Sequence, residues 1–188
     1  MRNDRRRFSL CRMTPVYLIT TARSRDLAAL PSIELAAASL FDGHVPSSIP
    51  MVISSEAELA FAQTESLLWV ALADDAVVGF AHVKMLEPSV AHLEELDVHP
   101  AHGCQGLGRR LVMAVCDWAA GAGHEAVTLT TFRDPPWNMP FYASLGFVAL
   151  SPDTIGATLA AIVREEARRG LDPALRVAMR RPSAQRHR

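Results

Sequence analysis

The sequence has few cysteines and no long apolar run, and each absence excludes a class of protein. Its three cysteines, Cys11, Cys104 and Cys116, form no CxxC pair and are too few for a disulfide framework. No apolar segment approaches the roughly 18–20 residues that cross a bilayer. Arginines interrupt the only apolar stretch near the start and leave no clean signal-peptide core. We therefore expect a soluble, reduced, cytoplasmic protein without a membrane partner.

The composition is that of a globular protein. Of 188 residues, 49% are hydrophobic and 21% are charged, and the chain is long enough to bury a core. No repeat or low-complexity linker divides it. We predict one domain over residues 13–181, between a disordered basic segment at 1–12 and a basic tail at 182–188.

Charge is distributed unevenly, although the formal net charge is only −1. Residues 1–12 hold five arginines against one acidic residue, and residues 164–188 hold eight against three. Residues 13–163 are left with six basic and sixteen acidic residues, a net charge of −10. An acidic middle favours a cationic ligand. We interpret the basic ends as solvated tails in preference to an arm that binds nucleic acid, which would bind with a steep salt dependence.

The pattern of apolar residues predicts an α/β (α+β) fold. Strands are predicted where apolar and β-branched residues cluster, at 16–20, 67–73, 77–86, 91–98, 126–132, 147–150 and 175–180. Helices are predicted at 27–40 with Asp26 as cap, 55–63, 107–121, 136–145 and 154–169. Together these elements predict a mixed, mostly antiparallel sheet of six or seven strands flanked by helices.

A glycine-bearing loop between the fourth strand and a long helix indicates a ligand site. Gly103, Gly106 and Gly108 let the backbone approach a ligand, and the first N–H groups of the helix point outward without an internal partner. Arg109 and Arg110 in the first helical turn are unfavourable for the helix itself, so they indicate an anion above the helix start. The spacing is neither a Rossmann fingerprint nor a Walker loop. The alternative is a simple tight turn.

Three segments resemble the GNAT superfamily of N-acetyltransferases. The loop resembles its motif A, Gln/Arg-x-x-Gly-x-Gly/Ala, except that Gly103 replaces the usual Gln or Arg. The run from Asn138 through Tyr142 to Gly146-Phe147 resembles a later signature, and the first strand with Arg23 and Asp26 resembles the usual N-terminal part. The resemblance covers residues 14–150. It implies a V-shaped sheet whose splayed central strands admit the pantetheine arm of acetyl-coenzyme A.

The resemblance also implies which residues contact the acetyl-coenzyme A cofactor. They are Leu96, Asp97, Val98, Gly103, Cys104, Gln105, Gly106, Leu107, Gly108, Arg109 and Asn138. Backbone groups of Leu96 and Val98 would pair with the pantetheine, and the loop would bind the pyrophosphate. Asn138 either contacts the cofactor or caps a helix. His99, His102 and Cys104 lack the partners of a metal cluster, so no metal is expected.

Acetyl transfer to an amine requires a base, because primary amines have a pKa of ~10.4 and are protonated at neutral pH. Regular alternation places His92, Glu94, Leu96 and Val98 on one face of their strand, and Leu93, Glu95 and Asp97 on the other. Glu94 is the preferred base and His92 the second candidate. Glu95 replaces them if a β-bulge shifts the register. The alternative is that these carboxylates are solvated surface charges.

Tyr142 matches the position of the superfamily's general acid toward the coenzyme sulfur; its alternative role is a packed core tyrosine. Trp137 with Phe132, and Phe41 with Asp42 and His44, lie on loops that would line an acceptor pocket.

We therefore predict an N-acetyltransferase in which a primary amine of a cationic small molecule or protein attacks acetyl-coenzyme A directly. The alternative is a catalytically silent acyl-coenzyme A sensor. Pairing through the last strand would give a homodimer.

Overall fold

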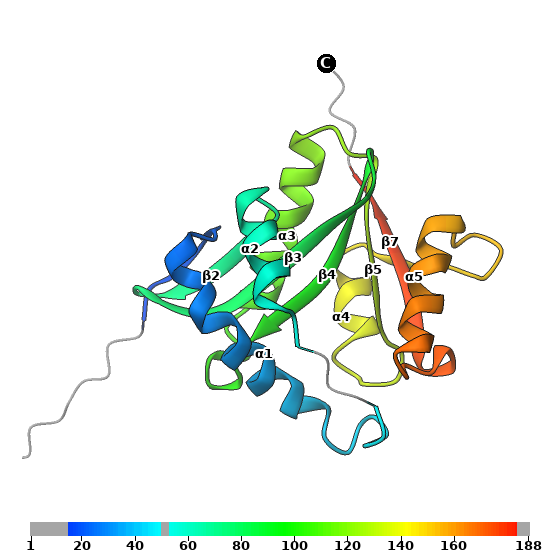
Figure 1. Ribbon diagram of the computed structural model, residues 1–188, viewed down its shortest axis with the longest axis horizontal. Helices are drawn as coiled ribbons and strands as arrows, with labels where there is room; N and C mark the ends of the chain where they lie inside the picture. The colour runs from blue at the N-terminus through cyan, green and yellow to red at the C-terminus, as the bar shows by residue number, and fades with distance from the viewer. Residues whose placement is uncertain (1–14, 50–52, 184–188) are drawn as a thin grey trace, which may run out of the picture.

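The computed structural model describes residues 15–49 and 53–183, which form one twisted sheet with helices on both faces (Figure 1). The strands are β1 (Tyr17–Thr21), β2 (Leu68–Ala73), β3 (Ala76–Glu87), β4 (Val90–Val98), β5 (Ala126–Phe132), β6 (Val148–Ala149) and β7 (Arg176–Pro182). They lie in the order β1-β2-β3-β4-β5-β7-β6. The expected mixed, mostly antiparallel sheet of six or seven strands is confirmed, and it has seven.

The pairing of β4 with β5 is the feature that creates the site. It is the parallel contact of the sheet, and it joins four residue pairs, from Val90↔Ala126 to Leu93↔Leu129. Beyond Leu93 the two strands separate, and α4 (Met139–Ser144) is seen in the opening between them (Figure 1). The carboxyl half of β4 therefore has no strand partner on its β5 side.

Helices cover the sheet on both faces. The other helices are α1 (Leu30–Ala38), α2 (Glu56–Thr64), α3 (Leu107–Gly121) and α5 (Ala157–Arg168). In Figure 1, α1 and α2 lie in front of the sheet and α3 behind it. Leu111, Val112 and Val115 of α3 are fully buried against the sheet, and Leu30 and Leu59 are buried on the opposite face. Burial of these apolar side chains is the main force that holds the layers together.

Strand β4 contains a bulge at Glu94 that corrects the expected alternation. Its neighbour β3 pairs Val83 with Leu93 and then His82 with Glu95, so Glu94 is an extra residue. A bulge reverses the order of faces beyond it. His92, Glu94, Glu95 and Asp97 consequently face α1 and α2. Leu96 and Val98 face α3, so the prediction that they share a face with Glu94 was wrong.

Two local expectations also need correction. Asp26 does not cap the helix that follows; it lies inside a short 3-10 helix and accepts a hydrogen bond from the backbone N–H of Arg23 at 2.8 Å. The last helix begins at Ala157, three residues later than expected, because Gly156 takes a left-handed φ of +74°. Segment 1–12 and most of the basic tail lie outside the described residues. Across the part of the chain that is described, no helix has the length and apolar character to span a bilayer.

Candidate active site

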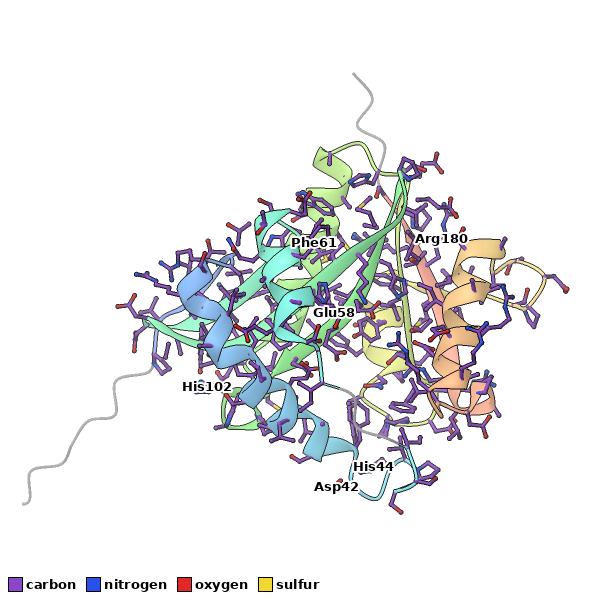
Figure 2. All side chains as sticks on the ribbon, viewed as in Figure 1. Asp42, His44, Glu58, Phe61, His102 and Arg180 are labelled. Atoms are coloured by element: carbon purple, nitrogen blue, oxygen red, sulfur yellow. The ribbon has the colours of Figure 1, made fainter. Side chains whose placement is uncertain are left out.

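A cavity of about 550 Å³ lies in the opening between β4 and β5. The C-terminal part of α1 and the loop after it form one wall, and β5 with α4 forms the other. Five carboxylates line it, from Glu34, Asp42, Glu94, Glu95 and Asp97, against one basic side chain, Arg176. Asp42 and His44 lie on the loop after α1 (Figure 2). The cavity therefore has the acidic character predicted for the middle of the chain.

Glu94 is neutralised by the only lysine in the sequence. The Nζ atom of Lys84, on β3, donates to Glu94 Oε1 at 2.7 Å and lies 3.6 Å from Glu58 of α2. Burial alone would raise the pKa of Glu94, but the hydrogen bond and charge of Lys84 outweigh it and hold this pKa below its usual value. A carboxylate with a lowered pKa is a poor proton acceptor at neutral pH.

His92 lies beside Glu94 and is buried from solvent. Only 1% of it is exposed, and its Nδ1 is 3.0 Å from Thr128 Oγ1. Its Nε2 lies 3.8 Å from Glu94 Oε2. Burial lowers the pKa of His92 to about 4, although the charge of Glu94 opposes the shift. The imidazole is therefore neutral, and too weakly basic to take a proton from an ammonium group efficiently.

Glu95 has the opposite properties. Burial, together with repulsion from Glu34 and Glu94, raises the pKa of Glu95 to about 7. Burial and the nearby Glu95 and Glu34 also raise the pKa of Asp97 well above its usual value. A half-buried carboxyl that titrates near neutral pH and lines a cavity has the character of a general base.

Tyr142 of α4 lines the cavity from the side opposite α1. Its ring packs edge-on against Phe141 and Phe147, at centroid distances of 5.0 and 5.8 Å. Burial raises the pKa of Tyr142, and the carboxylates Glu95 and Asp97 raise it further. The side chain is thus both packed against aromatics and open to the cavity, so its two expected roles are compatible. Its hydroxyl stays protonated at any physiological pH.

Asn138 occupies the N-cap position of α4, yet its side chain does not cap the helix. Its Nδ2 donates to Thr131 Oγ1 at 2.9 Å, and 8% of the residue is exposed. This bond ties the start of α4 to β5 and so fixes the helix that carries Tyr142. The sequence left two roles open for Asn138, a contact with the cofactor or a cap of the helix. The structure shows no capping by its side chain.

The loop before α3 offers free backbone donors. Among the described residues, the N–H groups of Cys104, Gln105 and Gly106 donate to no protein acceptor, and Arg110 is the first residue of α3 whose N–H bonds within the helix. Gly106 has a φ of +72°, and a Cβ there would meet open space. These unpaired donors at the positive end of a helix fit a pyrophosphate. The residues present therefore suit a coenzyme A moiety.

The other residues of this loop have different environments. The Gly103 N–H donates to the Pro100 carbonyl at 3.0 Å, so it belongs to the turn and not to the free donors. Arg109 is exposed, whereas Arg110 Nη2 donates to the Tyr17 carbonyl at 2.9 Å and supports β1. Leu107 is buried, and Gly108 lies close to Phe141 and Leu96. Among the described residues no group of His, Cys, Asp and Glu is arranged to hold a metal ion.

Aromatic side chains from two segments far apart in the sequence pack together beside the cavity, where Phe41 and Phe132 line it. Phe41 packs against Phe132 and Trp137 at centroid distances of 5.4 and 6.3 Å. His44 packs edge-on against Trp137 at 4.5 Å. These contacts give the acidic cavity an apolar wall.

Sequence reasoning missed two charged residues of the cavity. Glu34 lies on the buried face of α1, at helical spacing from Leu30 and Ala37. A carboxylate on the apolar face of a predicted helix could have identified it as a candidate site residue. Arg176 lies at the start of β7, where it donates to Glu166 at 2.8 Å and to Thr130 at 3.1 Å and packs over Phe132 at 4.7 Å. Its position depends on the pairing of β5 with β7, which has no local signal.

Comparison with known proteins agrees with this architecture. The chain is 32% identical over 80 residues to glucosamine 6-phosphate N-acetyltransferase from Trypanosoma brucei brucei, a match that includes 39% of this chain and 52% of that protein. The chain thus spans about half the length of this curated relative.

Solved structures of N-acetyltransferases superimpose over most of the chain. The PaiA N-acetyltransferase from Thermoplasma acidophilum, in complex with coenzyme A, has a TM-score of 0.69 at 16% identity, over 89% of this chain and 99% of that one. The ribosomal-protein-S18-alanine N-acetyltransferase from Escherichia coli has a TM-score of 0.64 at 20% identity, over 92% and 97%. The sequence profile of the acetyltransferase (GNAT) family matches residues 35–147, so the chain belongs to this family of acyltransferases.

Proposed function

We propose that the protein transfers the acetyl group of acetyl-coenzyme A to a primary amine of a cationic acceptor by direct attack. Membership of the GNAT family supports acetyl transfer, and structures of this fold are solved with coenzyme A or acetyl-coenzyme A. The observation that carries the proposal is that the opening between β4 and β5 brings Glu95 and Tyr142 to one acidic cavity. When bound, acetyl-coenzyme A supplies a thioester whose acyl carbon an amine can attack.

In this proposal Glu95 is the base. Its carboxylate takes a proton from the acceptor ammonium, directly or through water, and leaves a nitrogen lone pair free to attack. A base with a pKa of about 7 is half ionised at neutral pH and retains useful basicity, which a strongly acidic carboxylate lacks. Glu94 and Lys84 then form a fixed ion pair beside it, and His92 supports Glu94.

Tyr142 supplies the proton at the other end of the reaction. Its hydroxyl donates to the sulfur that leaves, and the raised pKa keeps the proton in place until then. The free N–H groups of Cys104, Gln105 and Gly106 and the exposed Arg109 hold the pyrophosphate. The unpaired edge of β4 at Leu96, Asp97 and Val98 accepts the pantetheine in the manner of an added strand.

The proposal is tested by binding and turnover together. We expect saturating acetyl-coenzyme A or coenzyme A to raise the melting temperature, because a ligand at about 100 times its Kd adds about 2.7 kcal/mol to the free energy of unfolding. An amine panel should then release free thiol in proportion to acetylated product. Binding without transfer to any amine would favour the silent sensor, and absence of binding would overturn both functions.

A further inference from the structure

One buried carboxylate in the cavity has no role in the steps above. Glu34 of α1 is 6% exposed, and its Oε1 accepts hydrogen bonds from the backbone N–H and the hydroxyl of Ser54, at 3.0 and 3.2 Å. Its Oε2 is buried and has no hydrogen-bond partner among the described residues, although it belongs to a side chain that lines the cavity. A buried oxygen of this kind is costly unless a ligand satisfies it.

Within residues 15–49 and 53–183, no lysine or arginine forms an ion pair with Glu34. Lys84 is bound to Glu94 and Glu58, and the Arg176 guanidinium is bound to Glu166 and Thr130. Glu34 instead faces other acids, because its charge raises the pKa of both Glu95 and Asp97. The cavity thus holds three carboxyls, Glu34, Glu95 and Asp97, that form no ion pair with a lysine or arginine in the described part of the chain.

An acceptor with a single, reacting amine does not supply a partner for all three of these carboxyls. The reacting nitrogen gives its proton to Glu95 and becomes neutral, so it brings no positive charge to Glu34. The buried oxygen of Asp97, Oδ2, likewise has no partner in the described chain. The apolar wall of Phe41 and Phe132 beside these carboxyls suits an aliphatic spacer.

We infer that the acceptor carries a second cationic nitrogen that does not react, and that Glu34 binds it together with Asp97. The acceptor class is therefore a diamine or a longer amine with at least two positive charges, and Glu34 is the residue that determines this specificity. The inference rests on the proposed function, whose acceptor site it describes. It adds a charge requirement that acetyl transfer alone does not impose.

The test compares diaminobutane with butylamine, which have the same carbon chain and differ in one cationic group. Calorimetric titration of each amine into protein saturated with coenzyme A measures affinity without turnover. We expect diaminobutane to bind about tenfold or more tightly than butylamine. Glu34→Gln, which keeps the shape and removes the charge, should abolish most of this difference. Equal affinities in the wild type, or an unchanged difference in Glu34→Gln, would overturn the inference.

Three further variants separate specificity from structural support. Ser54→Ala removes the hydroxyl partner of Glu34 and leaves its charge, so the preference for diaminobutane should remain; its loss there would indicate a structural role. Glu56→Gln, at an exposed carboxylate on α2 outside the cavity, should change neither affinity. If Glu34→Gln does not fold, Glu34→Asp retracts the charge by one methylene and should reduce the preference.

Turnover distinguishes failure of the inference from failure of the function. Thiol release is measured with both amines in parallel with the titrations. Acetyl transfer without a preference for the diamine would overturn the inference and leave the acetyltransferase assignment standing. Binding of coenzyme A without transfer to any amine would overturn the proposed function, whatever the affinity for diaminobutane.

Discussion

The ammonium group of Lys84 lies 2.7 Å from Oε1 of Glu94, so the only lysine in the sequence neutralises the carboxylate that strand alternation favours as the base. The neighbouring Glu95 has no such cationic partner among the residues that the structure describes, and its pKa is raised to about 7. Two adjacent glutamates on the same side of a bulged strand thus differ in ionisation because one cation contacts one of them. This difference makes the roles of the two residues separable by experiment.

Replacing Glu95 by Gln should lower kcat/KM by about 100-fold or more, because the variant lacks a proton acceptor. In the wild type, kcat/KM should rise with pH through about 7 as Glu95 ionises, and this rise should vanish in Glu95→Gln. The measurement is a pH–rate profile of thiol release. Glu94→Gln is the matched control and should keep the rise, and the assignment fails if the rise is lost in that variant and retained in Glu95→Gln.

The variant Tyr142→Phe should lower kcat while the affinity for coenzyme A changes little. The ring contacts with Phe141 and Phe147 survive the substitution, and only the hydroxyl is lost. Loss of a general acid costs about 100-fold or more in rate. Steady-state kinetics and a coenzyme A titration of the same preparation measure both quantities. Unchanged turnover would restrict Tyr142 to packing.

Substitution of Gly106 by Ala should weaken coenzyme A binding and destabilise the protein by about 1 kcal/mol, since a left-handed φ disfavours a Cβ. The added methyl group would also occupy the space from which a phosphate approaches the free N–H groups. Gly121→Ala, at the other end of α3, is the control, because no atom lies within 4 Å of its Cβ position. That variant should bind coenzyme A normally, and equal losses in both variants would contradict a phosphate site.

The raised pKa of Glu95 also predicts a pH dependence of stability. A carboxyl whose folded pKa exceeds its unfolded value binds its proton more tightly in the folded state. Its contribution to stability is therefore complete below the usual pKa of 4.5 and is lost as the pH rises through about 7. At ~1.4 kcal/mol per pKa unit, the rise from 4.5 to about 7 corresponds to a loss of about 3 kcal/mol.

The melting temperatures of wild type and Glu95→Gln at pH 5 and pH 8 provide the measurement for this effect. The variant cannot ionise at this position, so it should gain stability relative to the wild type at the higher pH. A constant difference between the two proteins across this range would contradict the raised pKa.

Local sequence patterns were sufficient to predict the strands, the helices and the glycine loop. Each depends on residues close in sequence, such as the apolar face of α3 or the small residues before Leu107. The bulge at Glu94 was not predictable in this way, because it arises from the pairing of β4 with β3. The face of every side chain after Glu94, and hence the choice of Glu95 as the proposed base, depended on that pairing.

The rest of the site depended on contacts between distant segments. Glu34 and Asp97 are far apart in sequence, and only the packing of α1 on β4 brings them to one cavity. Arg176 likewise reaches the cavity through the pairing of β7 with β5. The sequence pattern predicted an acidic middle segment, but which of its carboxylates lack a counter-ion could be seen only in three dimensions.

The short parallel contact between β4 and β5 also has a mechanical consequence. The sheet has two parts, one of strands β1 to β4 and the other of strands β5, β7 and β6. The β4–β5 ladder that joins them has four residue pairs, all at the N-terminal ends of these two strands. A ligand that lies between the open ends contacts both parts and restricts their relative motion. We therefore expect a ligand bound in the opening to slow hydrogen exchange in both strands beyond Leu93 and Leu129. The bound ligand would then stabilise the fold, and its release would restore the motion between the two parts of the sheet.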